Sequence, residues 1–212
     1  AFVTLAAEDR AGALALARRY QDWHRIGRAF DQARSQSRID LHNLDLETQD
    51  VARFQRLLSP LLYPHQALRA RARTLRANTR GQSGLWPYAI SGDYPILLVR
   101  IDRREDASLV RELLQAHTYW RKRQLKIDLV ILNQRDMGYA QELSDHLNQL
   151  VTRMDSDAWL NRRGGIFLLR AGQIDEAGQT LLETAARVIL DAGAGTLDEQ
   201  LEPLTRRPHR LP

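Results

Sequence analysis

Three short apolar runs, each followed by a stretch of helical periodicity, constrain most strongly what this chain can fold into. The runs have the length of buried strands and are Ile96 to Ile101, Ile127 to Leu132 and Gly165 to Arg170. The helical patterns that follow them cover residues 107–121, 139–154 and 175–192. Apolar strands that alternate with amphipathic helices form parallel sheets covered by helices. The sequence therefore predicts an α/β fold with a small three-stranded, mostly parallel βαβαβα sheet.

The first 80 residues have a different pattern and are predicted to be a helical linker segment. Apolar side chains recur there at spacings of three and four. Ser59-Pro60 is expected to end the last long helix, because proline disfavours helix in the residue before it. Residues 1–5 are predicted to be the end of a strand. Residues 81–200 then form the small α/β domain, and residues 201–212, rich in proline and arginine, are expected to be a linker or a disordered tail.

Residue types argue against several kinds of site. The 212 residues include no cysteine, which excludes disulfides, thiolate metal sites and cysteine nucleophiles. The six histidines have no metal-ligand spacing, and no Gly-x-Ser-x-Gly elbow or glycine-rich phosphate loop follows a predicted strand. We therefore expect no catalytic residue, no metal and no cofactor. No apolar run approaches the roughly 18 residues of a membrane span, so no direct membrane insertion is expected.

The ends of the predicted strands are the places where an open parallel sheet would bind a ligand. They carry Asp102-Arg103, Asn133-Gln134 and Ala171-Gly172. The polar cluster that begins at Asn133 suits a ligand site or an ordinary turn, and we favour the turn. His117 lies on the apolar face of its predicted helix, which favours a hydrogen-bonded core histidine over a metal ligand.

The chain is basic, with 31 Lys and Arg against 26 Asp and Glu and a net charge of +5. Only Lys122 and Lys126 are lysines, and the arginines are scattered among nearly as many acids, as the composition of a GC-rich genome would give. The densest cluster is Arg69, Arg71, Arg73, Arg76 and Arg80. It lacks the interleaved aromatics of a nucleic-acid footprint and equally suits a solvated helix face that touches an acidic neighbouring domain. No nucleic acid is therefore expected as a partner, and a basic nucleic-acid-binding α/β module remains the alternative.

The loop at residues 83–95 combines turn formers with large aromatic side chains. Trp86, Tyr88 and Tyr94 lie close in sequence to Asp93. Flat aromatic faces hold sugar rings by stacking on the C–H face, while a neighbouring carboxylate accepts hydrogen bonds from the hydroxyls. The same aromatics would also fill a seam between the helical segment and the sheet. Trp86, Tyr88, Asp93 and Tyr94 are therefore candidates for sugar binding or for a domain interface.

Four stretches of the sequence together resemble the cyclic β-1,2-glucan synthases. They are residues 83–96 (SGLWPYAISGDYPI), 113–121 (LLQAHTYWR), 128–133 (DLVILN) and 164–170 (GGIFLLR). The first string is the longest and the most specific, and the resemblance covers roughly residues 1–200. The family commonly has glycine and leucine where this chain has Ala89 and Tyr94.

The resemblance implies a place in a much larger protein. Cyclic β-1,2-glucan synthases are membrane-anchored bacterial enzymes that build β-1,2-linked glucans from UDP-glucose. They combine a glycosyltransferase part, β-sandwich domains and a phosphorylase-like domain. This chain resembles the segment between a β-sandwich and the phosphorylase-like part, and it begins at Ala1 without a leader pattern, as we expect of a piece of a longer protein. The resemblance implies a non-catalytic connecting or accessory segment on the cytoplasmic side of the inner membrane, with other domains of the parent chain and β-glucan as partners.

Overall fold

The computed structural model describes residues 4–135 and 140–204. The chain divides into two compact units, Ala1–Thr48 and Gln49–Pro212, so the predicted boundary after residue 80 lies inside the second unit. The predictions for residues 1–3, Tyr139 and residues 205–212 lie outside the described residues. Thr4 and Leu5, which were expected to end a strand, are not part of one.

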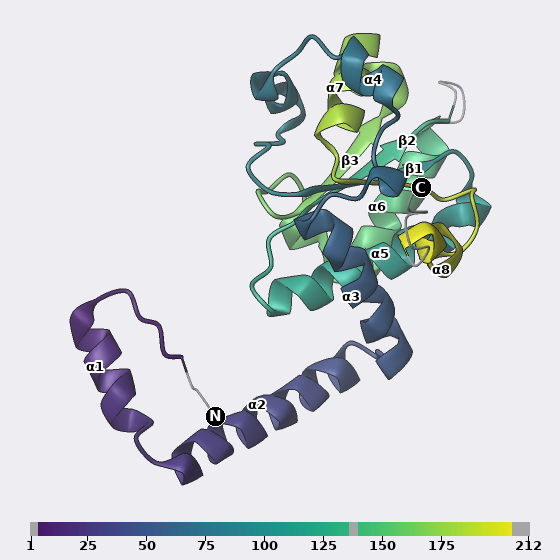
Figure 1. Ribbon diagram of the computed structural model, residues 1–212. Helices are drawn as coiled ribbons and strands as arrows, with labels where there is room; N and C mark the ends of the chain where they lie inside the picture. Colours follow the sequence, from purple (N-terminus) through teal and green to yellow (C-terminus); the bar gives the residue numbers. More distant parts are fainter. Residues whose placement is uncertain (1–3, 136–139, 205–212) are drawn as a thin grey trace, which may run out of the picture. The chain divides into compact units, whose positions relative to one another are not determined.

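The first unit contains helices α1 (Arg10–Arg19) and α2 (Trp23–Asn43) (Figure 1). Each begins after an aspartate whose carboxylate accepts a hydrogen bond from a first-turn backbone N–H, at 2.7 Å for Asp9 and 3.0 Å for Asp22. The large apolar side chains of α2 that are most exposed are Trp23 (61%), Phe30 (59%) and Ile39 (52%). Trp23 and Phe30 share one face of α2, which is therefore covered only in part, whereas Ile39 lies on the opposite face.

The second unit is built on a four-stranded parallel sheet with the strand order β3-β2-β1-β4. Its strands are β1 (Ile96–Ile101), β2 (Asp128–Asn133), β3 (Ile166–Arg170) and β4 (Val188–Asp191). The first three confirm the predicted runs to within one residue at each end. The prediction of only three strands is wrong, because residues 188–191, which were expected to be helical, pair with β1 from Leu97 and Val188 onward.

Helix α7 (Glu176–Ala185) ends well before residue 192, where the sequence pattern had placed its end. Ala186 leaves the helix with φ −60° and ψ 130°. The next backbone N–H, that of Arg187, donates to the carbonyl of Ile96 at 2.9 Å. The chain thus exchanges helical hydrogen bonds for bonds to the sheet, and this exchange depends on a distant strand that local periodicity does not reveal.

Helices cover both faces of the sheet (Figure 1). Helix α7 and the loop before β1 cover one face. The core on this face consists of Leu85, Ile90, Ile96, Leu98, Val130, Leu132, Phe167, Ile174, Leu181, Leu182 and Ala186. Helices α5 (Ala107–Lys122) and α6 (Ala140–Arg153) lie on the other face. The alternation of side chains along each strand supplies apolar residues to both layers.

Helix α3 (Thr48–Leu62) packs on α5 through the aromatic contact of Phe54 with Tyr119, whose ring centroids are 5.9 Å apart. It continues past Ser59, so the predicted end at that residue is wrong. Pro60 lies in its last turn and is buried. The apolar contacts of the buried ring offset the loss of the one helical hydrogen bond that proline cannot donate. The shorter helices of this unit include α4 (Ala72–Ala77) and α8 (Leu197–Leu201).

Ala89 has a left-handed backbone conformation, with φ 62° and ψ 10°. A Cβ atom is unfavourable in this region, so we expect Ala89→Gly to raise the free energy of unfolding by about 1 kcal/mol. Urea denaturation measures the change. As a control, Ala177→Gly in the first turn of α7 should lower stability by up to about 1 kcal/mol, and a loss of stability at both positions would contradict the prediction.

Candidate functional site

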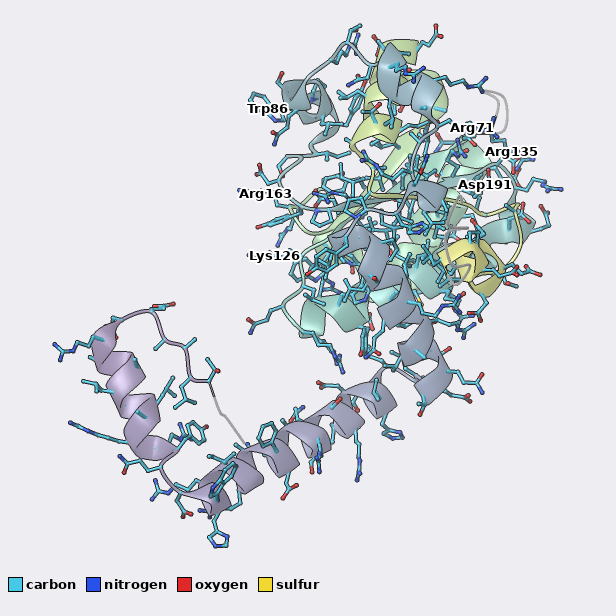
Figure 2. The ribbon with its side chains drawn as sticks, viewed as in Figure 1. Arg71, Trp86, Lys126, Arg135, Arg163 and Asp191 are labelled. Carbon is cyan, nitrogen blue, oxygen red and sulfur yellow. The ribbon has the colours of Figure 1, made fainter. Side chains whose placement is uncertain are left out.

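The loop that carries the predicted site residues lies at the amino ends of the strands, immediately before β1. It contains the 3₁₀ helix η2 (Gln82–Tyr88), and Leu85 and Ile90 fix it to the sheet core. Figure 2 shows Trp86 on one side of the unit and Asp191, the last residue of β4, on the opposite side. Open parallel sheets bind ligands beyond the carboxyl ends of their strands. The predicted residues therefore lie at the edge opposite to the one where such a fold would bind a ligand.

Trp86 and Tyr88 have different surroundings although they are two residues apart. Trp86 is 64% exposed. Tyr88 packs against the sheet core, and its hydroxyl lies so close to Gly178 that a Cβ atom at that glycine would be 2.5 Å away. Gly178 is in the first turn of α7, where its N–H donates to the capping carboxylate of Asp175 at 2.9 Å. Tyr88 thus holds the loop against α7, whereas the indole of Trp86 is presented to solvent.

Asp93 and Tyr94 are brought together through Arg163. Arg163 forms an ion pair with the carboxylate of Asp93, which also accepts a hydrogen bond from Gln82 Nε2 at 3.0 Å. Arg163 Cζ and Lys126 Nζ lie 5.4 Å and 5.6 Å from the centroid of the Tyr94 ring, within the range of cation–π attraction. The carboxylate and the phenol ring are therefore both engaged by side chains of the chain itself.

A buried polar group lies next to this cluster, where β2 begins. Asp128 is fully buried, and its Oδ1 accepts a hydrogen bond from the backbone N–H of Gly164 at 2.7 Å. His117 Nε2 lies 3.1 Å from the carbonyl oxygens of both Ile127 and Gly164, so this nitrogen carries the proton and donates. The prediction of a hydrogen-bonded core histidine is confirmed. Asp128 was not predicted, although a single acid inside an apolar strand was a signal for it.

Burial shifts the titration of both groups away from their ordinary values. Desolvation raises the pKa of Asp128 from 3.8 to about 6, although the hydrogen bond from Gly164 and the charge of Arg163 act in the opposite direction. Desolvation, with a smaller contribution from the charge of Arg121, lowers the pKa of His117 from 6.5 to about 4. At neutral pH the buried pair is thus a carboxylate and a neutral imidazole.

The glycine pair Gly164-Gly165 serves close packing at the amino end of β3. A Cβ atom on Gly165 would lie 2.2 Å from the carbonyl oxygen of Trp159. This separation is too short for any residue other than glycine. Gly164 has φ 70°, a conformation that favours glycine. The pair therefore positions the Gly164 N–H for Asp128 and is placed before a strand, as the sequence indicated.

At the carboxyl edge, the predicted cluster around Asn133 has a structural role. Asn133 Nδ2 donates to the carbonyl of Ala140 at 2.9 Å and to Ser144 Oγ at 3.1 Å, and its Oδ1 accepts from the N–H of Arg135 at 3.0 Å. These bonds tie the end of β2 to the first turn of α6. The turn interpretation of this cluster is therefore supported.

The sequence identified Asp102-Arg103 at the carboxyl edge but missed Asp191 beside it, because β4 was not foreseen. The strand order reverses between β1 and β4, and such a switch point is the preferred ligand position of open parallel sheets. There Arg103 Nε lies 3.2 Å from Asp106 Oδ2, and Asp191 Oδ1 accepts from the Gly193 N–H at 3.0 Å. Loops after two adjacent strands thus place acidic and basic groups side by side.

Within residues 4–135 and 140–204, no group of three or more His, Asp or Glu side chains is arranged to hold a metal ion. No helix of this part of the chain combines the length and the apolar character that crossing a bilayer requires.

The sheet, its covering helices and the exposed tryptophan define the second unit as an open parallel α/β unit with an aromatic loop at its amino edge. No protein-family model matches the chain. Over 205 residues, 96% of the chain, the sequence is 33% identical to the cyclic beta-(1,2)-glucan synthase NdvB of Rhizobium meliloti (strain 1021), and the chain spans 7% of that protein's length. This similarity confirms the resemblance: the chain is related to a segment of a cyclic β-1,2-glucan synthase.

Proposed function

We propose that this chain is a non-catalytic connecting and accessory segment of a cyclic β-1,2-glucan synthase, and that Trp86 is its contact with glucan. The similarity over 96% of the chain supports the relationship to such a synthase. Glucosyl transfer from UDP-glucose is ascribed to other parts of the parent protein. The proposal includes a membrane-associated parent, with this segment on its cytoplasmic side.

The proposed connecting role is supported by the surface of α2. Trp23 and Phe30, which are seven residues apart and so share one apolar stripe of α2, are each more than half exposed. Apolar helix stripes are normally covered, and large exposed apolar patches mark interaction sites. The related protein is far longer than this chain. We therefore propose that other domains of the parent chain cover this stripe.

The proposed glucan contact is supported by the exposure of Trp86. Of the four residues that the sequence singled out, Tyr88 packs on α7, Asp93 is held in an ion pair, and the Tyr94 ring is flanked by two cations. Trp86 alone among them presents most of its side chain to solvent, on a loop that the buried Leu85 holds in place. A rigid, exposed indole is a stacking surface that loses little conformational entropy on binding.

Calorimetric titration with β-1,2-linked glucooligosaccharides tests this contact. We expect the chain to bind at millimolar sugar and Trp86→Ala to weaken binding about tenfold or more, with Trp86→Phe intermediate because a smaller ring still stacks. Trp23→Ala is the matched control, since Trp23 is 61% exposed but lies on α2, and it should bind like the unaltered chain. No heat at millimolar sugar, or equal binding by Trp86→Ala, would refute the glucan contact.

A further inference from the structure

A groove lined by arginines lies beside the β4 edge of the second unit. Its volume is about 480 Å³, and its charged lining residues are Arg69, Arg71, Arg73, Arg100 and Glu183. Arg69 and Arg71 come from the segment that leads into α4, Arg73 is in α4, Arg100 is in β1, and Glu183 is in α7. Three separate elements of the fold therefore build this groove, and it does not belong to a single exposed helix face.

The charges in the groove do not balance. Arg100 Nη1 lies 3.2 Å from Glu183 Oε1 and its Nε lies 3.9 Å from Asp191 Oδ2, so the positive charge of Arg100 is compensated. Arg69 Nη2 donates to the backbone carbonyl of Thr184 at 2.9 Å, which fixes the side chain but leaves its charge uncompensated. Arg71 and Arg73 are exposed and form no ion pair with any residue that the structure describes. The groove therefore has a surplus of positive charge.

Arg69 also has unused hydrogen-bonding capacity. Its Nε atom is buried and has no hydrogen-bond partner among the described residues, whereas Arg100 Nε lies 3.9 Å from Asp191 Oδ2. A guanidinium group has five N–H donors in a planar fork that matches the oxygens of a phosphate. Arg69, which its bond to Thr184 holds in place, thus keeps a donor for an anionic oxygen of a ligand.

The groove lies where the fold would be expected to bind a ligand. Ile189 of β4 lines it together with Arg100 of β1, and these two strands flank the reversal of strand order. Arg100 pairs in register with Asp191, so it is close to the carboxyl end of both strands. Figure 2 shows Arg71 on the same side of the unit as Asp191, away from Trp86. Both position and charge therefore favour an anionic ligand here.

We propose that this groove binds a small phosphate-bearing molecule. A phosphate group carries up to two negative charges and several acceptor oxygens, which suits a surplus of fixed guanidinium groups better than a single carboxylate does. None of the described lining residues is aromatic, so the groove lacks the stacking platforms with which proteins hold single-stranded nucleic acid. Its volume is in the range of small-molecule sites.

Titration calorimetry of the 212-residue chain at low salt tests the proposal with pyrophosphate, a nucleoside diphosphate and a single-stranded oligonucleotide. We expect one or both small ligands to bind, and Arg71→Gln/Arg73→Gln to weaken that binding about tenfold or more. Both side chains are exposed, so this double variant should keep its fold, which circular dichroism checks. Arg18→Gln/Arg38→Gln removes the same charge from exposed positions of α1 and α2 and should leave binding unchanged.

The two small ligands show which part of a phosphate-bearing molecule the groove recognises. Equal affinities mean that the groove recognises phosphate alone, and tighter binding of the nucleoside diphosphate means that it also contacts the nucleoside; both results support the proposal. It is overturned if neither small ligand binds, if both double variants lose binding equally, or if only the oligonucleotide binds.

Discussion

Phe54→Ala is expected to lower the free energy of unfolding of the α/β unit by about 3–5 kcal/mol, the usual cost of truncating a buried aromatic side chain. Phe54 is completely buried on α3 and contacts Tyr119 of α5. Its removal leaves a cavity between a helix from the predicted linker and a helix of the predicted domain. Hydrogen exchange of the β1 and β2 amides reports the global opening of this unit and measures the loss.

Phe30→Ala is the matched control for this prediction. The same side chain is truncated, but Phe30 is 59% exposed on α2, so the change in stability should stay within about 0.5 kcal/mol. An equally small effect of Phe54→Ala would show that α3 is not an integral part of the α/β unit. A large effect places residues 49–62 in the folding unit of the sheet, although the sequence pattern assigned them to a linker.

Substitutions at Asp128 and His117 are expected to change stability with opposite dependence on pH. The folded pKa of Asp128, about 6, is above its ordinary 3.8, so its stabilising contribution is present below pH 3.8 and is lost as the pH rises through 6. The folded pKa of His117, about 4, is below its ordinary 6.5, so its contribution is present above pH 6.5 and is lost as the pH falls through 4. Each contribution is about 3 kcal/mol.

Urea denaturation between pH 4 and 7 measures these contributions against variants that lack them. The stability of the unaltered chain minus that of Asp128→Asn should fall by about 3 kcal/mol over this range. The stability of the unaltered chain minus that of His117→Gln should rise by a similar amount. The double variant lacks both contributions, and its difference from the unaltered chain should vary little with pH. Slopes of the same sign for the two single variants would contradict the prediction.

The elements that the sequence predicted well are those whose signals are local. β1 matches its predicted bounds because its apolar run lies between Pro95 and Asp102, and α5 follows its predicted helical pattern to within one residue. β4 was missed because Val188, Ile189 and Leu190 continue the apolar pattern of α7, with no glycine or proline between. Only pairing with β1 makes these residues a strand, and a short apolar run does not by itself distinguish strand from helix.

The candidate site was likewise predicted only where the signal was local in sequence. The sequence identified Trp86 and Asp93 from the unusual composition of their loop. It did not show that Arg163, far along the chain, would form an ion pair with the Asp93 carboxylate and lie within cation–π distance of the Tyr94 ring. Nor did the arginine cluster reveal which of its members faces β1 and α7, because that depends on the position of β4. Partners distant in sequence decide which polar groups remain available to a ligand.

The position of β1 between β2 and β4 has a consequence for how the protein is made. Strands β1, β2 and β3 leave the ribosome in order, but β1 gains its second neighbour only when Val188 has been translated. Until then, the nascent polypeptide exposes an apolar edge whose peptide groups are open to pairing with other chains. A product truncated ahead of that residue would therefore be prone to aggregate, and co-translational folding of the unit can finish only after residues Val188–Asp191 have been translated.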